Sequence, residues 1–132
     1  ALGPIQRRVA RVMEQSVAAI PAAWLERRVD LAPVRTRARS IAAEAGIVVT
    51  EIDLLVAAVG RAAAHHPNFN AFLTRDHQLR RFAQVNVGVA TDVEGDLFVV
   101  VVRDAAAKEP AAIARELRGL QYLAARRRLG PE

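Results

Sequence analysis

The side chains of this sequence that could perform nucleophilic or acid–base chemistry are three histidines and two serines: His65, His66, His77, Ser16 and Ser40. The two adjacent histidines end a predicted helix, where the helix dipole favours a cationic side chain, and the third lies in a polar loop. One serine falls within a predicted helix, the other lies near the end of another helix, and neither neighbours a base. We therefore expect structural roles for all five and no nucleophile–base pair of the kind that acyl transfer needs.

Metal and phosphate sites are also not expected. The sequence has no cysteine, which excludes a disulfide framework, a cysteine-based zinc site and a cysteine nucleophile. The histidines lack the spacing of a metal-binding motif. The seven glycines are too scattered to form a phosphate-binding loop. We expect no metal site and no covalently bound cofactor.

The composition describes one domain or part of one. Of the 132 residues, 52% are hydrophobic but only 5% are aromatic, so the core must consist of small aliphatic side chains. The net charge of +5 would attract anionic partners such as coenzyme A or an acidic protein surface. Because the arginines are dispersed, nucleic-acid binding is only a third hypothesis, and we expect no nucleic-acid partner.

Nothing in the sequence indicates a membrane protein. The apolar run Leu97–Val102 is too short to cross a bilayer, and no segment resembles a signal peptide. We expect no membrane partner and a cytoplasmic location.

Hydrophobic periodicity predicts the elements that must position any site. The predicted helices are Ile5–Val17, Leu31–Ala45, a third from Thr50 to about His65, and Pro110–Arg128. The predicted strands are Ala23–Val29, Phe69–Leu73, Gln78–Phe82, Val85–Ala90 and Leu97–Val102. This order predicts an α/β fold (α+β, two layers) in which helices pack on a mixed β-sheet.

Several boundaries have a stereochemical reason. Asp30 is expected to cap the second helix, and Gly46 is expected to end it. Thr50 and Asp53 have the spacing of a capping box at the start of the third helix. The largely β-branched run Leu97–Val102 predicts a strand that is buried on both faces.

Six local strings, in a fixed order, carry a resemblance to a known family. They are Ile5–Met13, Ile20–Pro21 with the stretch that ends at Val29–Asp30, Thr50–Leu55, His66–Asn70, Val85–Ala90 and Leu97–Asp104. The most specific is Val-Asn-Val-Gly-Val-Ala, followed shortly by Leu-Phe-Val-Val-Val-Val-Arg-Asp. The chain resembles the catalytic domain of dihydrolipoamide acyltransferases of 2-oxo acid dehydrogenase complexes, which share the chloramphenicol acetyltransferase-like fold.

The sequence departs from the family pattern in places. Val100 replaces a usual proline, Ile52 replaces a usual asparagine or proline, and the turn glycine is shifted by one within Glu94–Asp96. The family carries its catalytic serine and a His-x-x-x-Asp motif in a C-terminal half that would follow Glu132. We therefore expect residues 1–132 to be the N-terminal half of one catalytic domain, with no catalytic residue of its own and no activity alone.

The resemblance implies roles for three residues. Asn86 and Asp92 lie on the strand and loop that line the family's substrate channel, so they are candidate substrate-binding residues. Arg11 matches a family arginine that pairs with the aspartate of the His-x-x-x-Asp motif and so orients the catalytic histidine. The alternatives are a solvated helix arginine for Arg11, and a strand-edge or turn residue for Asn86 and for Asp92.

The resemblance also implies substrates and partners. These are a thioester of coenzyme A or of a lipoyl group, a lipoyl domain, and other copies of the chain in a trimer or higher oligomer. Two alternatives stay open. One is a non-enzymatic module that assembles with itself or with a partner, because half a sheet leaves apolar edges exposed. The other is a free-standing acyltransferase of specialised metabolism.

Overall fold

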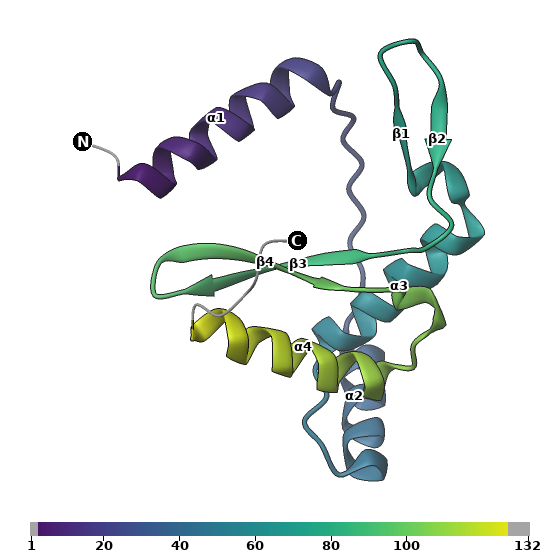
Figure 1. The fold of residues 1–132 in the computed structure, drawn as a ribbon. Coiled ribbons are helices and arrows are strands. Elements are labelled where there is room, and N and C mark those ends of the chain that lie inside the picture. Colours follow the sequence, from purple (N-terminus) through teal and green to yellow (C-terminus); the bar gives the residue numbers. More distant parts are fainter. Residues whose placement is uncertain (1–2, 127–132) are drawn as a thin grey trace. The chain divides into compact units, whose positions relative to one another are not determined.

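A computed structural model describes residues 3–126, which divide into two units at Asp30. The first unit holds the helix α1 (Pro4–Ala19), and the second, from Leu31 onward, holds all other elements. These are α2 (Ala32–Ala45), α3 (Glu51–His65), η1 (Pro67–Phe69), β1 (Ala71–Leu73), β2 (Leu79–Arg81), β3 (Val87–Val93), β4 (Asp96–Val102), η2 (Ala105–Ala107) and α4 (Pro110–Ala125) (Figure 1). None of the helices in residues 3–126 has both the length and the apolar content needed to cross a membrane.

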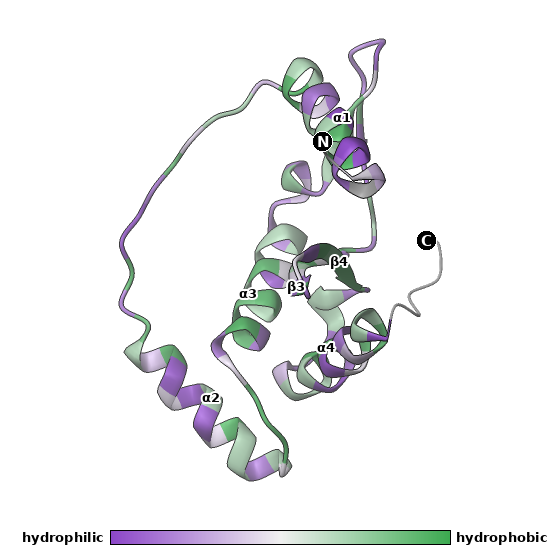
Figure 2. Cartoon of the chain, turned by 90° about the vertical axis from the view of Figure 1, so that its left-hand side faces the viewer, coloured by the Kyte–Doolittle hydropathy of each residue, from purple (hydrophilic) through white to green (hydrophobic). Residues whose placement is uncertain are grey.

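The first unit is one amphipathic helix followed by an irregular extended segment. Purple and green residues alternate along α1 (Figure 2), and its apolar side chains Val12, Met13 and Val17 are all exposed. The strand predicted at Ala23–Val29 is absent, so that prediction was wrong. A β-strand needs a partner strand for its backbone groups, and the unit that contains this segment offers none.

Helix α2 begins and ends close to its predicted limits. Gly46 follows its last residue with φ +63°, the left-handed conformation that a glycine tolerates best, as expected. The capping role predicted for Asp30 was wrong, because the helix begins one residue later and Leu31 occupies the N-cap position. The carbonyl of Leu31 accepts the first helical bond, from the Arg35 N–H.

The capping box at the start of α3 is confirmed. Asp53 Oδ2 accepts hydrogen bonds from the backbone N–H of Thr50 at 2.7 Å and from its hydroxyl at 2.9 Å. The pair fixes where the helix begins, because it satisfies a backbone N–H that has no helical partner.

The strands form two separate antiparallel hairpins. Strand β1 pairs with β2, and β3 pairs with β4 over seven residues each. The α/β class is confirmed, but the strands of residues 3–126 form two antiparallel pairs and not the mixed sheet that we expected.

Helices α3 and α4 cover one face of the β3–β4 hairpin (Figure 1). The core between them contains small and branched apolar side chains, and β4 is green along most of its length (Figure 2). Val100, Val102, Ile113 and Leu117 are at most 2% exposed. Aliphatic side chains thus build the core, as the composition predicts.

The opposite face of the hairpin is uncovered within its unit. It consists of Gly88, Ala90, Asp92, Leu97, Val99 and Val101, which alternate with the core-facing residues. Leu97 is 59% exposed and Val99 is 60% exposed. The prediction that β4 is buried on both faces was therefore wrong. Within the described residues of the second unit, nothing packs over this outer face.

The predicted end of the last helix falls partly outside the described residues. Helix α4 extends to Ala125, whereas the sequence pattern predicts an end at Arg128. The expected stop at Gly130–Pro131 also lies outside them.

Candidate functional site

Asn86, the first candidate substrate-binding residue, lies directly before β3. Its Oδ1 accepts a hydrogen bond from the backbone N–H of Asp104 at 2.9 Å. Beside it, the Ala105 N–H donates to the carbonyl of Val85 at 2.8 Å. Asp104 has φ +46°, a left-handed conformation that costs energy for a residue with a side chain. Asn86 therefore helps to hold a strained turn that connects β4 to η2.

Asn86 also lines a pocket of about 540 Å³. The other lining residues are Asn70, Phe82, Ala83 and Gln84. The amide nitrogen of Asn70 donates to the carbonyls of Phe82 and Gln84, both at 3.0 Å, and so holds the segment that leads from β2 to β3. The sequence pattern places Asn70 in a family turn but gives no sign of this bridging role.

Asp92, the second candidate, lies at the far end of the same hairpin. Its Oδ1 accepts from the N–H of Gly95 at 3.5 Å, within the β3–β4 turn. Asp92 lies six positions after Asn86 along extended chain, which corresponds to roughly 20 Å. The two candidates lie at opposite ends of one hairpin, and their substrate-binding roles stay a prediction.

Arg11 lies on α1, in the first unit. Its side chain is exposed and has no partner among residues 3–126. The pairing with a motif aspartate therefore stays a prediction.

Within the described part of the second unit, Ser40 and the three histidines do not form a nucleophile–base pair. Ser40 donates to Glu44 on the same helix at 2.7 Å, and Ser16 lies on α1 in the other unit. Nδ1 of His65 bonds the carbonyl of Arg61 at 2.8 Å, as expected for a helix end. His77 occupies a left-handed turn position with φ +60°.

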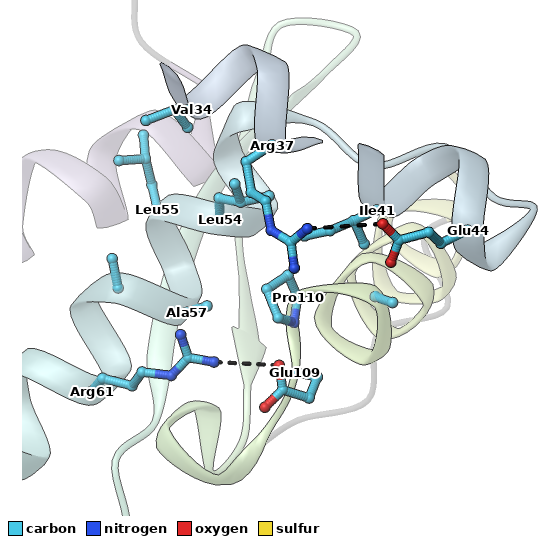
Figure 3. A pocket seen from close by; sticks show the side chains of 12 residues that line it. Val34, Arg37, Ile41, Glu44, Leu54, Leu55, Ala57, Arg61, Glu109 and Pro110 are labelled. Carbon is cyan, nitrogen blue, oxygen red and sulfur yellow. Dashed lines mark hydrogen bonds and ion pairs between the residues drawn. The ribbon is translucent and has the colours of Figure 1, made fainter. Parts of the chain in front are cut away.

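A second pocket, of about 460 Å³, lies between α2, α3 and the start of α4 (Figure 3). Its wall is apolar, from residues such as Val34, Leu54 and Pro110. Two exposed ion pairs lie at its rim: Arg37–Glu44 at 3.8 Å and Arg61–Glu109 at 3.5 Å. Because two acidic and two basic side chains lie at this rim, the pocket has no preference for an anionic or a cationic ligand.

Two buried or half-buried ion pairs join parts of the second unit, and the sequence pattern predicts neither. Arg118 on α4 donates to Asp53 Oδ2 on α3 at 2.8 Å, and Asp53 is fully buried. Lys108 pairs with Glu116 at 2.5 Å, and Glu116 also accepts from the Arg103 N–H at 3.4 Å. Asp53 and Arg118 lie 65 positions apart, and Lys108 and Glu116 lie eight apart, so neither pair has the three- or four-residue spacing of a helical ion pair.

Electrostatics single out one further carboxylate. Hydrogen bonds from its own backbone N–H and then from Arg35 lower the pKa of Glu51 below its ordinary value. Glu51 lies outside both pockets and serves α3 as an acidic first-turn residue. Within residues 3–126, no group of three or more histidine, cysteine or acidic side chains could hold a metal ion.

Comparison with protein families gives a match over residues 1–132. The matching family is described as 2-oxoacid dehydrogenases acyltransferase (catalytic domain).

Relatives with known names agree with this match. An acetyltransferase component of the mitochondrial pyruvate dehydrogenase complex of Arabidopsis thaliana is 37% identical over 90 residues, which are 68% of this chain and 16% of that protein. The corresponding component of Zymomonas mobilis is 29% identical and is matched by 99% of this chain, over 30% of its own length. The chain thus spans less than a third of these relatives.

Solved structures share the fold. A probable dihydrolipoamide acetyltransferase of Listeria monocytogenes matches with a TM-score of 0.86 and 27% identity, over 98% of this chain and 57% of that one. The dihydrolipoamide acetyltransferase of Azotobacter vinelandii matches with a TM-score of 0.87 and 25% identity, over 98% and 55%. By its sequence match along all 132 residues and by its fold, the chain belongs to the 2-oxoacid dehydrogenase acyltransferase family, in the catalytic domain.

Proposed function

We propose that this chain contributes to an acyltransferase catalytic domain that handles acyl thioesters of coenzyme A or of dihydrolipoamide. The observation that carries the proposal is the family match over residues 1–132, together with a fold that superposes on acetyltransferase domains. The cubic core of a pyruvate dehydrogenase complex and a dihydrolipoamide acetyltransferase are among the similar structures. We expect a lipoyl domain and further copies of the chain as partners.

Residues 1–132 should not catalyse the transfer alone. Acyl transfer needs a base for the thiol and donors for the oxyanion. Ser40 and His65 are each hydrogen-bonded within their own helix instead, to Glu44 and to the carbonyl of Arg61. In the Azotobacter protein, one serine, one histidine and one asparagine have been investigated for roles in the catalytic mechanism. We expect equivalents to be supplied by further residues of the natural protein or by a partner.

An activity assay tests this function. The 132-residue chain and the complete product of its gene are compared for acetyl transfer between acetyl-CoA and dihydrolipoamide. We expect turnover from the complete product and only the buffer rate from the 132 residues. Repurified 132-residue chain with turnover above buffer would contradict the assignment of its histidines and serines. A complete product that transfers no acyl group from any coenzyme A or lipoyl thioester would contradict the proposed function.

The alternative is a module that assembles with itself or with a partner without catalysis. The outer face of the β3–β4 hairpin favours it, because Leu97 and Val99 lie exposed there. Assembly is also expected of an acyltransferase core, so the activity assay on the complete gene product distinguishes the two.

A further inference from the structure

The pocket beside Asn86 contains two side-chain amides whose orientations are set by their partners. Oδ1 of Asn86 receives the N–H of Asp104, so this atom must be the oxygen. The Asn70 atom that bonds the carbonyls of Phe82 and Gln84 must be the nitrogen, because both partners only accept. Neither amide can be flipped without the loss of these bonds.

Each amide is left with one polar group that no residue in the described part of the chain engages. For Asn86 this is the NH₂ group, a donor, and for Asn70 it is the oxygen, an acceptor. Both residues line the same pocket of about 540 Å³, so one donor and one acceptor are available to a single ligand. The pocket has no charged lining residue, which disfavours an ionic ligand.

A secondary amide has the matching chemistry, because it carries one N–H donor and one carbonyl acceptor. The exposed ring of Phe82, which stacks on Phe72 at a centroid distance of 5.7 Å, provides an apolar surface for the methylene groups on either side of such an amide. A carboxylate or a phosphate would offer acceptors only and would leave the Asn70 oxygen unpaired.

We propose that this pocket binds a secondary amide on an aliphatic arm: Asn86 donates to the carbonyl of the amide, and Asn70 accepts its N–H. That the arm belongs to a thioester carrier rests on the proposed function, since coenzyme A and a lipoylated lysine each carry a secondary amide on a flexible aliphatic chain. Asn86 then has two roles, because its oxygen holds the Asp104 turn while its nitrogen contacts the ligand.

The test compares two small thiols with the 132-residue chain. N-acetylcysteamine carries the secondary amide, and 2-mercaptoethyl acetate replaces its N–H by an ester oxygen. Binding is followed by NMR, from the side-chain amide signals of Asn70 and Asn86 and the backbone signal of Ala83. We expect the amide to bind about three- to tenfold more tightly than the ester, which corresponds to one net hydrogen bond. Equal affinity for the two, or no shift at these signals, would overturn the proposal.

The variant Asn86→Asp isolates the donor. It keeps an oxygen for the Asp104 N–H but replaces the NH₂ group by a second acceptor, and we expect about three- to tenfold weaker binding of N-acetylcysteamine. Asn68→Asp is the matched control: Asn68 Oδ1 accepts from Arg81 at 2.9 Å, and this residue does not line the pocket. An equal loss in both variants would overturn the role of Asn86. If Asn86→Asp does not fold, the comparison of the amide and the ester with the unchanged chain still tests the proposal.

The outcome is separable from that of the proposed function. Turnover by the complete gene product with no preference for the amide would overturn the pocket assignment alone. Amide-selective binding without any turnover would support the pocket and contradict the acyltransferase proposal.

Discussion

The Asp53 side chain links the start of α3 to α4 in the core of the second unit. Its carboxylate is fully buried, with one oxygen bonded to Thr50 and Arg118. The second oxygen has no hydrogen-bond partner in the described part of the chain. The carboxylate thus caps α3 and ties it to α4, and its burial is stabilising only while the arginine compensates the charge.

Removal of this carboxylate should destabilise the fold. Asp53→Ala loses the cap and the ion pair, but the Arg118 side chain that remains is 38% exposed and can be solvated. We expect a loss of about 1–3 kcal/mol in the free energy of unfolding, most of it from the cap. Glu51→Ala is the control, since Glu51 is also acidic and in the first turn of α3 but lies at the surface. Urea unfolding of both variants measures the difference. Similar losses in the two would show that the Asp53–Arg118 pair adds little.

The stability should also depend on the ionisation of Glu51. Its folded-state pKa is lower than its ordinary value of 4.5, first because of its backbone N–H and then because of Arg35. A lowered folded pKa gives a contribution that is present above the unfolded pKa and is lost as the pH falls through the folded one. From about pH 6 to about pH 3, we expect the Tm of Glu51→Gln to fall less than that of the unchanged chain. Parallel pH profiles of Tm would contradict this.

At the scale of elements, the sequence predicts those boundaries that local stereochemistry determines. The left-handed Gly46 and the Thr50–Asp53 pair are visible as residue types at fixed spacing. The strand expected at Ala23–Val29 fails because strand formation depends on a partner elsewhere, which residue types do not reveal. The same reason explains why the prediction for β4 failed. Its apolar run predicts burial on both faces, but no element covers its outer face in the described part of its unit.

The contact between α3 and η2 depends on one glycine. A Cβ on Gly60 would lie 2.8 Å from the carbonyl carbon of Ala105 and 2.9 Å from the nitrogen of Ala106, both of them backbone atoms. Because a backbone cannot rotate away as a side chain can, Gly60→Ala must separate the two elements. This close approach explains why a helix interior retains a residue that disfavours helices.

Two Gly→Ala variants test this contact. Gly60→Ala should lower the free energy of unfolding by about 1–3 kcal/mol through overpacking. Gly119→Ala, in α4, has no atom within 4 Å of the added Cβ and should raise stability by about 0.5–1 kcal/mol. Thermal unfolding of the two variants gives the sign of each change. A stabilised Gly60→Ala would mean that α3 and η2 do not pack as described.

At the scale of the whole molecule, six short strings suffice to identify the family, but they do not reveal how the site residues are used. The pattern marks Asn86 as a candidate, yet its bond to Asp104 joins residues that lie 18 positions apart. The resemblance likewise implies that Asp92 and Asn86 line one substrate channel, which stays a prediction; in the structure they lie at opposite ends of β3. Contacts across the fold decide these roles, and residue spacing along the chain does not encode them.

The outer face of the β3–β4 hairpin leads to a prediction about assembly. Leu97 and Val99 lie exposed side by side with Gly88, Ala90 and Val101 on this face, and such contiguous apolar surface favours association. We therefore expect the 132-residue chain to sediment as an oligomer rather than as a species of 14.3 kDa. A stable folded monomer at all accessible concentrations would contradict this.

A charge on that face should weaken the association. Val99→Lys places a cation among the apolar side chains of the outer face, which is costly to bury without a partner. Val48→Lys is the matched control, since Val48 is 69% exposed but lies in the loop between α2 and α3. Sedimentation velocity should show dissociation at higher concentrations for Val99→Lys than for the control, with unchanged circular dichroism in both. If the two variants dissociate equally, the added charge is responsible and the hairpin face is not the interface.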